Sequence, residues 1–219
     1  SQIPSNVSYI HAIIDRLIRA VHSQEQFRVI IVLPLYPEGN YLELTYYKQR
    51  LQNTQRAIIT IIQLFSPHCP SDIDPLDYIG IYSLRTWDVL KEKVMTEEIY
   101  VRSKILIVDD QVLIISNSAL RNPTNNTSEI GLRITDSEQI QIPMGGNPFK
   151  VGLFPHTVRM NLMKSHIQCE DITQLYDLCC HTKKSHPAHL SNPYYISWHY
   201  IASQNSEIYD QIELLLYLS

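Results

Sequence analysis

Apolar and polar residues alternate in blocks along the chain, and the first block has a helical period. Between Val7 and His22, apolar side chains recur every three or four positions, with Asp15, Arg16 and Arg19 between them. This spacing predicts an amphipathic helix with one apolar face. From Phe27 to Leu35 the chain is continuously apolar and rich in β-branched residues, which predicts a buried strand in a sheet covered on both faces.

Helical and strand patterns continue through the middle of the chain. A helical pattern runs from Leu44 to Phe65 and stops at the proline-rich segment 66–75, which predicts a loop. Further strands are predicted at Tyr78–Leu84, Ile99–Ser116 and Ser128–Ile134. The second of these is divided by the turn residues Asp109, Asp110 and Gln111, so we expect it to form a hairpin of two strands.

Beyond Gly145 and Gly146 the pattern becomes helical again. Helices are predicted at Phe154–Ile167, Ile172–Cys180 and about 192–218. The order helix, strand, helix, strand, hairpin, strand predicts an α/β fold, with a mixed β-sheet flanked by helices. We expect a single domain over 1–219, with an α/β core at 1–135 and a helical part at 150–219.

Composition and charge restrict the partners that the chain can attract. Apolar residues make up 44% of the 219 positions, which is typical of a globular protein, and the formal net charge is −4. A negative chain has no general attraction for nucleic acid or for an anionic surface. We therefore expect no nucleic-acid partner, and any phosphate recognition must come from a few local basic residues.

The cysteines and histidines do not have the spacing of a metal site. No CxxC pair has a matching second pair among the four cysteines, Cys69, Cys169, Cys179 and Cys180. The histidines of the segment 181–193 have no carboxylate or thiolate in register, so a solvated loop is favoured there. We expect neither a metal nor another cofactor.

Hydropathy and cysteine usage indicate where the chain resides. No run reaches the roughly 18 apolar residues of a membrane span, and the opening segment lacks the uninterrupted apolar stretch of a signal peptide. The cysteine pattern favours a reducing compartment. A cytoplasmic location, peripheral at membranes, is therefore expected.

The segment IYVRSKILIVDD carries the clearest chemical signal. It resembles the HxKxxxxD signature of the phospholipase D superfamily, which in the eukaryotic enzymes lies in a segment of the type YVHSKxxIVDD. The matching positions are Tyr100, Val101, Ser103, Lys104, Ile107, Val108, Asp109 and Asp110. FRVIIVLPLYPEG, YIGIYSLRT, SEIGLRI and the helical segments near the end also resemble parts of this family. Nearly the whole chain is thus similar to one lobe, the carboxyl-terminal catalytic lobe, of a eukaryotic-type phospholipase D.

The resemblance implies a reaction and a set of partners. The family hydrolyses phosphatidylcholine to phosphatidic acid and choline, with one histidine forming a phosphohistidine and a second protonating the leaving alcohol. These histidines come from two lobes, so a second lobe, from the same gene or from a homodimer, is an expected partner. The other expected partner is a phospholipid headgroup or a membrane surface. By resemblance Lys104 holds a phosphoryl oxygen and Asp109 holds neighbouring groups in place.

The central residue departs from the family pattern, because Arg102 occupies the position of the nucleophilic histidine. A guanidinium stays protonated up to about pH 12 and is neither base nor nucleophile near neutral pH. The turn that follows is also altered, and Asn117 and Ser118 are the residues there that can offer donors to a phosphate. Glu129 matches the acid that orients the family's histidine, and we hypothesise that it forms an ion pair with Arg102.

These departures leave several functions open. We expect the chain to be inactive in the family reaction as it stands, although whether it is an enzyme is left undecided. The alternatives are a non-catalytic phosphate- or phospholipid-binding pseudoenzyme and the structural half of a two-lobe phospholipase D. A further alternative is catalysis by another histidine, for which His156 is the nearest candidate, but a capping or packing role is favoured for it.

Overall fold

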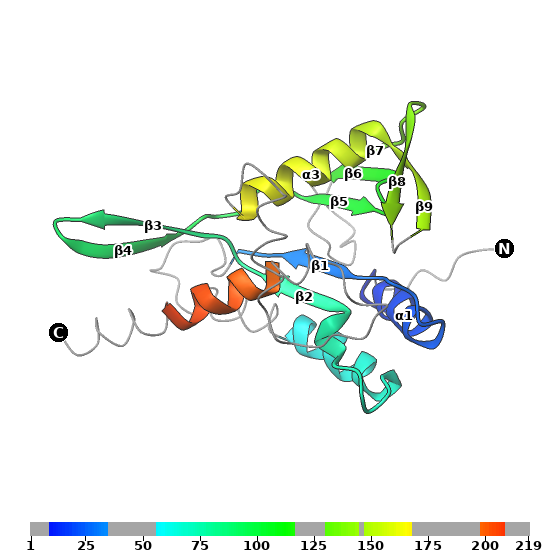
Figure 1. Cartoon of the computed structure of the whole chain (residues 1–219), viewed down its shortest axis with the longest axis horizontal. Coiled ribbons are helices and arrows are strands. Elements are labelled where there is room, and N and C mark those ends of the chain that lie inside the picture. Colours follow the sequence, from blue (N-terminus) through cyan, green and yellow to red (C-terminus); the bar gives the residue numbers. More distant parts are fainter. Residues whose placement is uncertain (1–8, 35–55, 117–129, 145–146, 168–197, 209–219) are drawn as a thin grey trace. The chain divides into compact units, whose positions relative to one another are not determined.

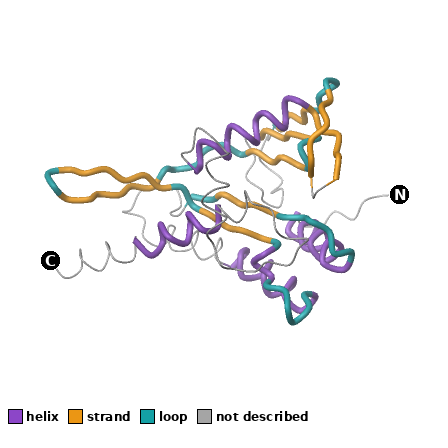
Figure 2. The backbone as a smooth tube through the Cα atoms, in the orientation of Figure 1, coloured by secondary structure: helices purple, strands orange, loops and turns teal. Residues whose placement is uncertain are grey.

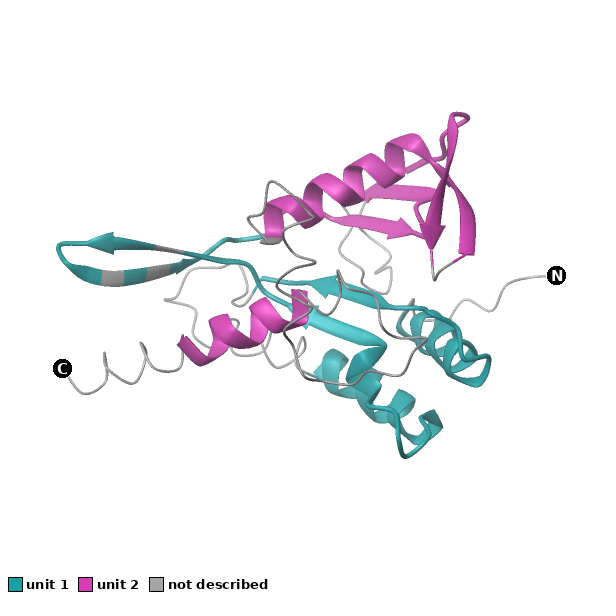
Figure 3. Cartoon of the chain, in the orientation of Figure 1, with its two compact units in different colours: residues 1–101, 186–190, 209–219 teal, residues 102–185, 191–208 magenta. Residues whose placement is uncertain are grey.

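The computed structural model describes residues 9–34, 56–116, 130–144, 147–167 and 198–208 (Figure 1). The predicted helix at 172–180 and loop at 181–193 lie outside these ranges, as does much of the helical pattern from Leu44 to Phe65. The chain divides into two compact units (Figure 3). Among the described residues, the first unit holds 9–34 and 56–101, and the second holds 102–116, 130–144, 147–167 and 198–208.

The first unit begins with the predicted amphipathic helix, α1 at Tyr9–His22. Its apolar face buries Leu17 completely and leaves Ile14 and Val21 only 4% and 3% exposed. This spacing of three and four residues is the period that predicted the helix. On the polar side, the Arg16 guanidinium donates to a Glu25 carboxylate oxygen at 2.7 Å and lies over the Phe27 ring.

The core of this unit lies between α1, the helical residues 56–65 and a pair of parallel strands, β1 at Val29–Val32 and β2 at Ile79–Tyr82. Burial brings Phe65 against Tyr78, with ring centroids 5.9 Å apart in an edge-to-face contact. Val29 and Ile31 pack against this core, whereas Ile30 between them is 37% exposed. The expectation that both faces of β1 are covered is therefore wrong at Ile30.

The proline-rich loop connects the helical residues 56–65 to β2, as expected. It contains two short 3-10 turns, η1 at Ser66–His68 and η2 at Pro75–Asp77. The Asp74 side chain caps the second turn by accepting a hydrogen bond from the Leu76 backbone N–H at 2.9 Å.

An antiparallel hairpin that the sequence patterns did not predict follows β2. Its strands are β3 at Arg85–Leu90 and β4 at Lys93–Glu98, joined by Lys91 and Glu92, whose φ angles are 51° and 64°. Two left-handed residues in a two-residue loop give the hairpin turn that suits the twist of antiparallel strands. The hairpin is a two-stranded sheet of its own (Figure 2).

The second unit contains the hairpin predicted within Ile99–Ser116, but its first strand is shorter. Strand β5 spans Ile105–Val108 and β6 spans Val112–Ser116, and β7 at Gly131–Ile134 pairs with β6 on its other side. Residues 99–104 therefore lie before the strand, although the Ser116 N–H still donates to the Lys104 carbonyl at 3.1 Å. The turn falls at the three predicted residues, 109–111.

A second unpredicted hairpin leads into the next helix. Strands β8 at Gln139–Met144 and β9 at Asn147–Gly152 are antiparallel, and α3 at Leu153–Ile167 follows directly, which confirms the predicted helix at Phe154–Ile167. Residues 198–208 are also helical, within the predicted segment 192–218. The small sheets, parallel in β1–β2 and antiparallel elsewhere, are flanked by helices, which confirms the α/β class.

Candidate functional site

The motif residues lie where the chain enters and leaves β5. Arg102 and Lys104 precede this strand and are both exposed. Asp109 follows it, exposed in the turn to β6. The segment therefore places two cationic side chains, two residues apart, at an accessible edge of the second unit.

The turn after β5 has an unusual backbone. Asp109 and Asp110 have φ angles of 49° and 53°, in the left-handed region that asparagine, aspartate and glycine tolerate best. The Gln111 N–H closes the turn onto the Val108 carbonyl at 2.9 Å. The Gly152 N–H donates to the Asp110 carbonyl at 2.9 Å, so the turn is joined by its backbone to the end of β9.

The side chain of Asp110 is the centre of an ion-pair cluster at the start of α3. Its side chain is 1% exposed. The carboxylate accepts two hydrogen bonds from Arg159, one from Nε at 2.6 Å and one from Nη2 at 2.7 Å. His156 Nδ1 lies 2.8 Å from the same carboxylate. We call Asp110, His156 and Arg159 the Asp110 cluster. Because the guanidinium binds with two parallel hydrogen bonds, it fixes both the position and the plane of the carboxylate.

The charge of Asp110 is maintained by its partners. Burial alone would raise the pKa of this carboxyl group, but the hydrogen bonds from Arg159 and His156, with the charge of Arg159, outweigh it and hold the pKa below its usual range. The carboxylate is therefore ionised at neutral pH. Its ion pairs join the β5–β6 turn to α3. Because Arg102 and Lys104 precede β5, the cluster fixes the position of the hairpin next to them.

His156 has the geometry that could support proton transfer, although its carboxylate is shared. With Nδ1 directed at Asp110, the other ring nitrogen, Nε2, is the one available for further contacts, and the side chain is 20% exposed. A carboxylate that holds an imidazole in one tautomer is the arrangement found behind catalytic histidines. Here the same carboxylate also accepts two hydrogen bonds from Arg159. This favours a packing role for His156, as expected from the sequence, over a catalytic one.

Three of the predicted site residues, Asn117, Ser118 and Glu129, lie outside the described residues. The ion pair between Arg102 and Glu129 thus stays a prediction, as do the phosphate contacts of Asn117 and Ser118. The described contacts of the Asp110 cluster do not include Asp109, whose role also stays a prediction.

Sequence reasoning missed the set formed by Asp110, His156 and Arg159. Two signals could have found it. The motif ends in a pair of acids, of which either can turn inward, and His156 and Arg159 are three residues apart in a predicted helix, which places them on one face. The sequence therefore shows an acidic pair and a basic pair. It does not show that the two pairs lie close together in the fold.

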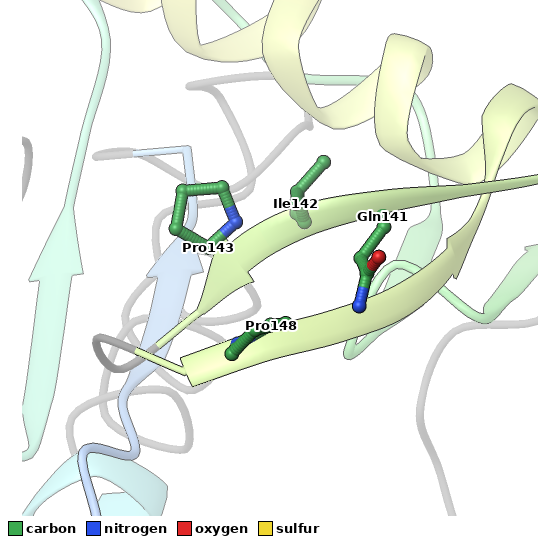
Figure 4. Close-up of a pocket in the computed structure, with 4 residues that line it drawn as sticks. All are labelled: Gln141, Ile142, Pro143 and Pro148. Carbon is green, nitrogen blue, oxygen red and sulfur yellow. The ribbon is translucent and has the colours of Figure 1, made fainter.

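The hollow drawn in Figure 4 is lined by none of these residues. It is lined by Gln141, Ile142, Pro143 and Pro148 of the β8–β9 hairpin. None of the predicted site residues borders it. Its lining is aliphatic apart from the Gln141 amide, so it offers no charged group to a phosphate.

The described residues contain neither a cluster suited to a metal ion nor a helix suited to span a membrane. No three or more histidine, cysteine, aspartate and glutamate side chains gather there in a way that could hold a metal ion. Among the described helices, none combines the length and the apolar character needed to cross a membrane.

Comparison with known proteins gives a consistent set of relatives. No family model matches the chain. It is 34% identical over 97% of its length to "Phospholipase D B" of Dictyostelium discoideum and 33% identical over 92% to "Phospholipase D C" of the same organism. It is 28% identical over 77% of its length to "Phospholipase D zeta 1" of Arabidopsis thaliana. The chain spans only 17%, 12% and 16% of these relatives.

Proposed function

We propose, from the homology of this chain to proteins named phospholipase D, that it is one lobe of a phospholipase D-type protein and is inactive in phosphodiester hydrolysis by itself. The lobe it resembles is the carboxyl-terminal one. The family reaction is the hydrolysis of phosphatidylcholine to phosphatidic acid and choline. The relatives are much longer than this chain, which supports the need for a second lobe.

Arg102 is the observation that carries the proposal. It is exposed before β5, at the position where the family pattern has a histidine that attacks phosphorus. Attack requires a lone pair on the nucleophile, and a protonated guanidinium offers none. The positive charge that Arg102 supplies can hold a phosphate oxygen, but it cannot form a phosphoenzyme.

The remaining motif residues are assigned by position. Lys104 binds a phosphoryl oxygen, and Asn117 and Ser118 donate to the same phosphate. Glu129 pairs with Arg102, and Asp109 holds neighbouring groups at the end of β5. The Asp110 cluster holds the β5–β6 turn against α3 and so fixes the hairpin that Lys104 precedes, without using residue 102.

Choline release from phosphatidylcholine vesicles tests the proposed inactivity. We expect the purified chain to release no more choline than a heat-treated control. In a longer protein that joins this chain to an intact first lobe, Arg102→His should raise choline release at least tenfold, because it restores a nucleophile. Release by the unchanged chain that is abolished by His156→Asn would overturn the proposal and identify His156 as a catalyst.

A second function, phosphate binding without cleavage, is favoured by the exposure of both Arg102 and Lys104 in one short segment. Two such cations suit a phosphodiester headgroup. Glycerophosphocholine, a soluble phosphodiester, is the probe. Lys104→Ala should weaken its binding at least fivefold in a phosphorus NMR titration, whereas Lys164→Ala, which removes an exposed lysine of α3, should not. Equal effects of the two changes would reject this function.

A further inference from the structure

The β3–β4 hairpin carries exposed apolar side chains that the folded unit does not use. Val89 is 54% exposed, Leu90 is 62% exposed and Met95 is 44% exposed. All three lie in the half of the hairpin next to the turn formed by Lys91 and Glu92. We call residues 89–95 the hairpin tip. Large apolar side chains gathered at the end of a ribbon indicate a contact that lies outside the unit.

These side chains lie on both faces of the ribbon. Directly paired residues of antiparallel strands share a face, and successive residues alternate. Leu90 pairs with Lys93, and Asp88 pairs with Met95, so Leu90 and Met95 belong to one face. Val89 belongs to the other. A protein partner packed on one face would leave the opposite apolar residues in water, whereas a medium that surrounds the tip covers both.

Two lysines lie at the same end of the ribbon. Lys91 and Lys93 stand on either side of Glu92, so residues 89–95 carry a net charge of +1, and Asp88 lies across from Met95 at their edge. At the other end, Glu97 and Glu98 pair in register with Thr86 and Arg85. Apolar side chains with lysines beside them suit the interface of a phospholipid bilayer, where apolar side chains enter the acyl boundary and lysines extend to lipid phosphates.

The pairing of the hairpin strands bears on their stability. Strands β3 and β4 pair only with each other among the described strands. An isolated two-stranded hairpin is marginally stable in water, and three strands or a packed surface are needed for independent stability. Burial of the tip in lipid would supply part of that surface.

We propose that the hairpin tip inserts into the interfacial region of a phospholipid bilayer and holds the chain at the membrane surface. This inference goes beyond the proposed function, because it assigns the membrane contact to residues outside the motif. It needs neither Arg102 nor Lys104.

Sedimentation of the full chain with vesicles tests the insertion. The probes are vesicles of phosphatidylcholine alone and vesicles with added phosphatidylserine. Leu90→Ser should weaken binding to both about tenfold, because it removes a large apolar side chain from the inserted tip. The double change Lys91→Gln and Lys93→Gln should weaken binding mainly to the anionic vesicles and remove its salt dependence.

Leu76→Ser is the matched control. Leu76 is 45% exposed on η2 in the same unit, so its replacement removes a similar exposed leucine away from the hairpin. Leu76→Ser should leave binding to phosphatidylcholine vesicles unchanged, and circular dichroism establishes that each variant is folded. Equal losses in Leu90→Ser and Leu76→Ser overturn the proposal. So does a Leu90→Ser chain that binds vesicles normally but no longer self-associates, because the tip would then be a protein contact.

Discussion

Asp109 and Asp110 are adjacent in sequence and share a left-handed turn, but they differ in solvent exposure and in the contacts of their side chains. Asp109 is exposed, whereas Asp110 is 1% exposed and has two basic partners. The sequence located the turn correctly. It could not select between the two acids, because the choice depends on the position of α3, which is more than 40 residues away in the chain.

Replacing the buried acid should therefore cost stability. Asp110→Asn removes the charge that Arg159 faces and one of its hydrogen-bond acceptors. We expect a loss of about 2 kcal/mol in the free energy of unfolding, because Asp110 is buried but the Arg159 side chain is 32% exposed, so water stabilises part of the charge left unpaired. Asp109→Asn is the matched control and should change this free energy by less than about 0.5 kcal/mol. Urea unfolding at neutral pH measures both.

The same carboxylate predicts a dependence on pH. The pKa of Asp110 is lower in the folded state than its ordinary value, so its contribution to stability is complete above about pH 4 and is lost as the pH falls through the folded-state pKa. The difference in urea midpoint between the unchanged chain and Asp110→Asn should thus shrink between pH 6 and pH 3. A difference that stays constant over this range would contradict the assignment.

Secondary-structure elements with a clear period were predicted well, and those stabilised by turns were not. Helices α1 and α3 and strands β1, β2 and β5 to β7 follow the patterns. Hairpin β3–β4 was missed because its turn residues, Lys91 and Glu92, are not the glycine or asparagine that mark such turns. Hairpin β8–β9 was missed because Pro143 and Pro148 face each other in its register, and proline argues against a strand.

The turn of the β3–β4 hairpin places two residues other than glycine, Lys91 and Glu92, in the left-handed region. Glu92 has a φ of 64°, so Glu92→Gly should relieve backbone strain and stabilise the hairpin by about 1 kcal/mol. Glu97→Gly makes the same chemical change within β4 and should destabilise it by a similar amount. Hydrogen exchange of the β3 and β4 amides should slow in the first variant and accelerate in the second. Changes of the same sign would contradict the turn geometry.

At the scale of the whole molecule, a single domain over 1–219 stays a prediction, and within it the chain packs into two compact units. The boundary falls between Val101 and Arg102, inside the motif segment. Local periodicity cannot reveal such a division, because it depends on which elements pack together rather than on where each begins. The α/β class was predictable, since it follows from element order alone.

Each unit has buried residues of its own, so we expect two unfolding transitions. Phe65→Ala in the first unit and Leu113→Ala in the second each delete a side chain that is 0% exposed, and should cost about 3 kcal/mol in their own unit. Hydrogen exchange of the α1 amides reports the first unit, and that of the α3 amides reports the second. If both substitutions shift both signals equally, the units unfold as one and the expectation fails.

The Asp110 cluster also bears on how such a chain can persist through evolution. The residues that tie the turn to α3 are 110, 156 and 159, and none of them is the residue at position 102. Histidine and arginine codons differ by a single base, so an exchange of these two residues at position 102 would leave the contacts of the cluster unchanged.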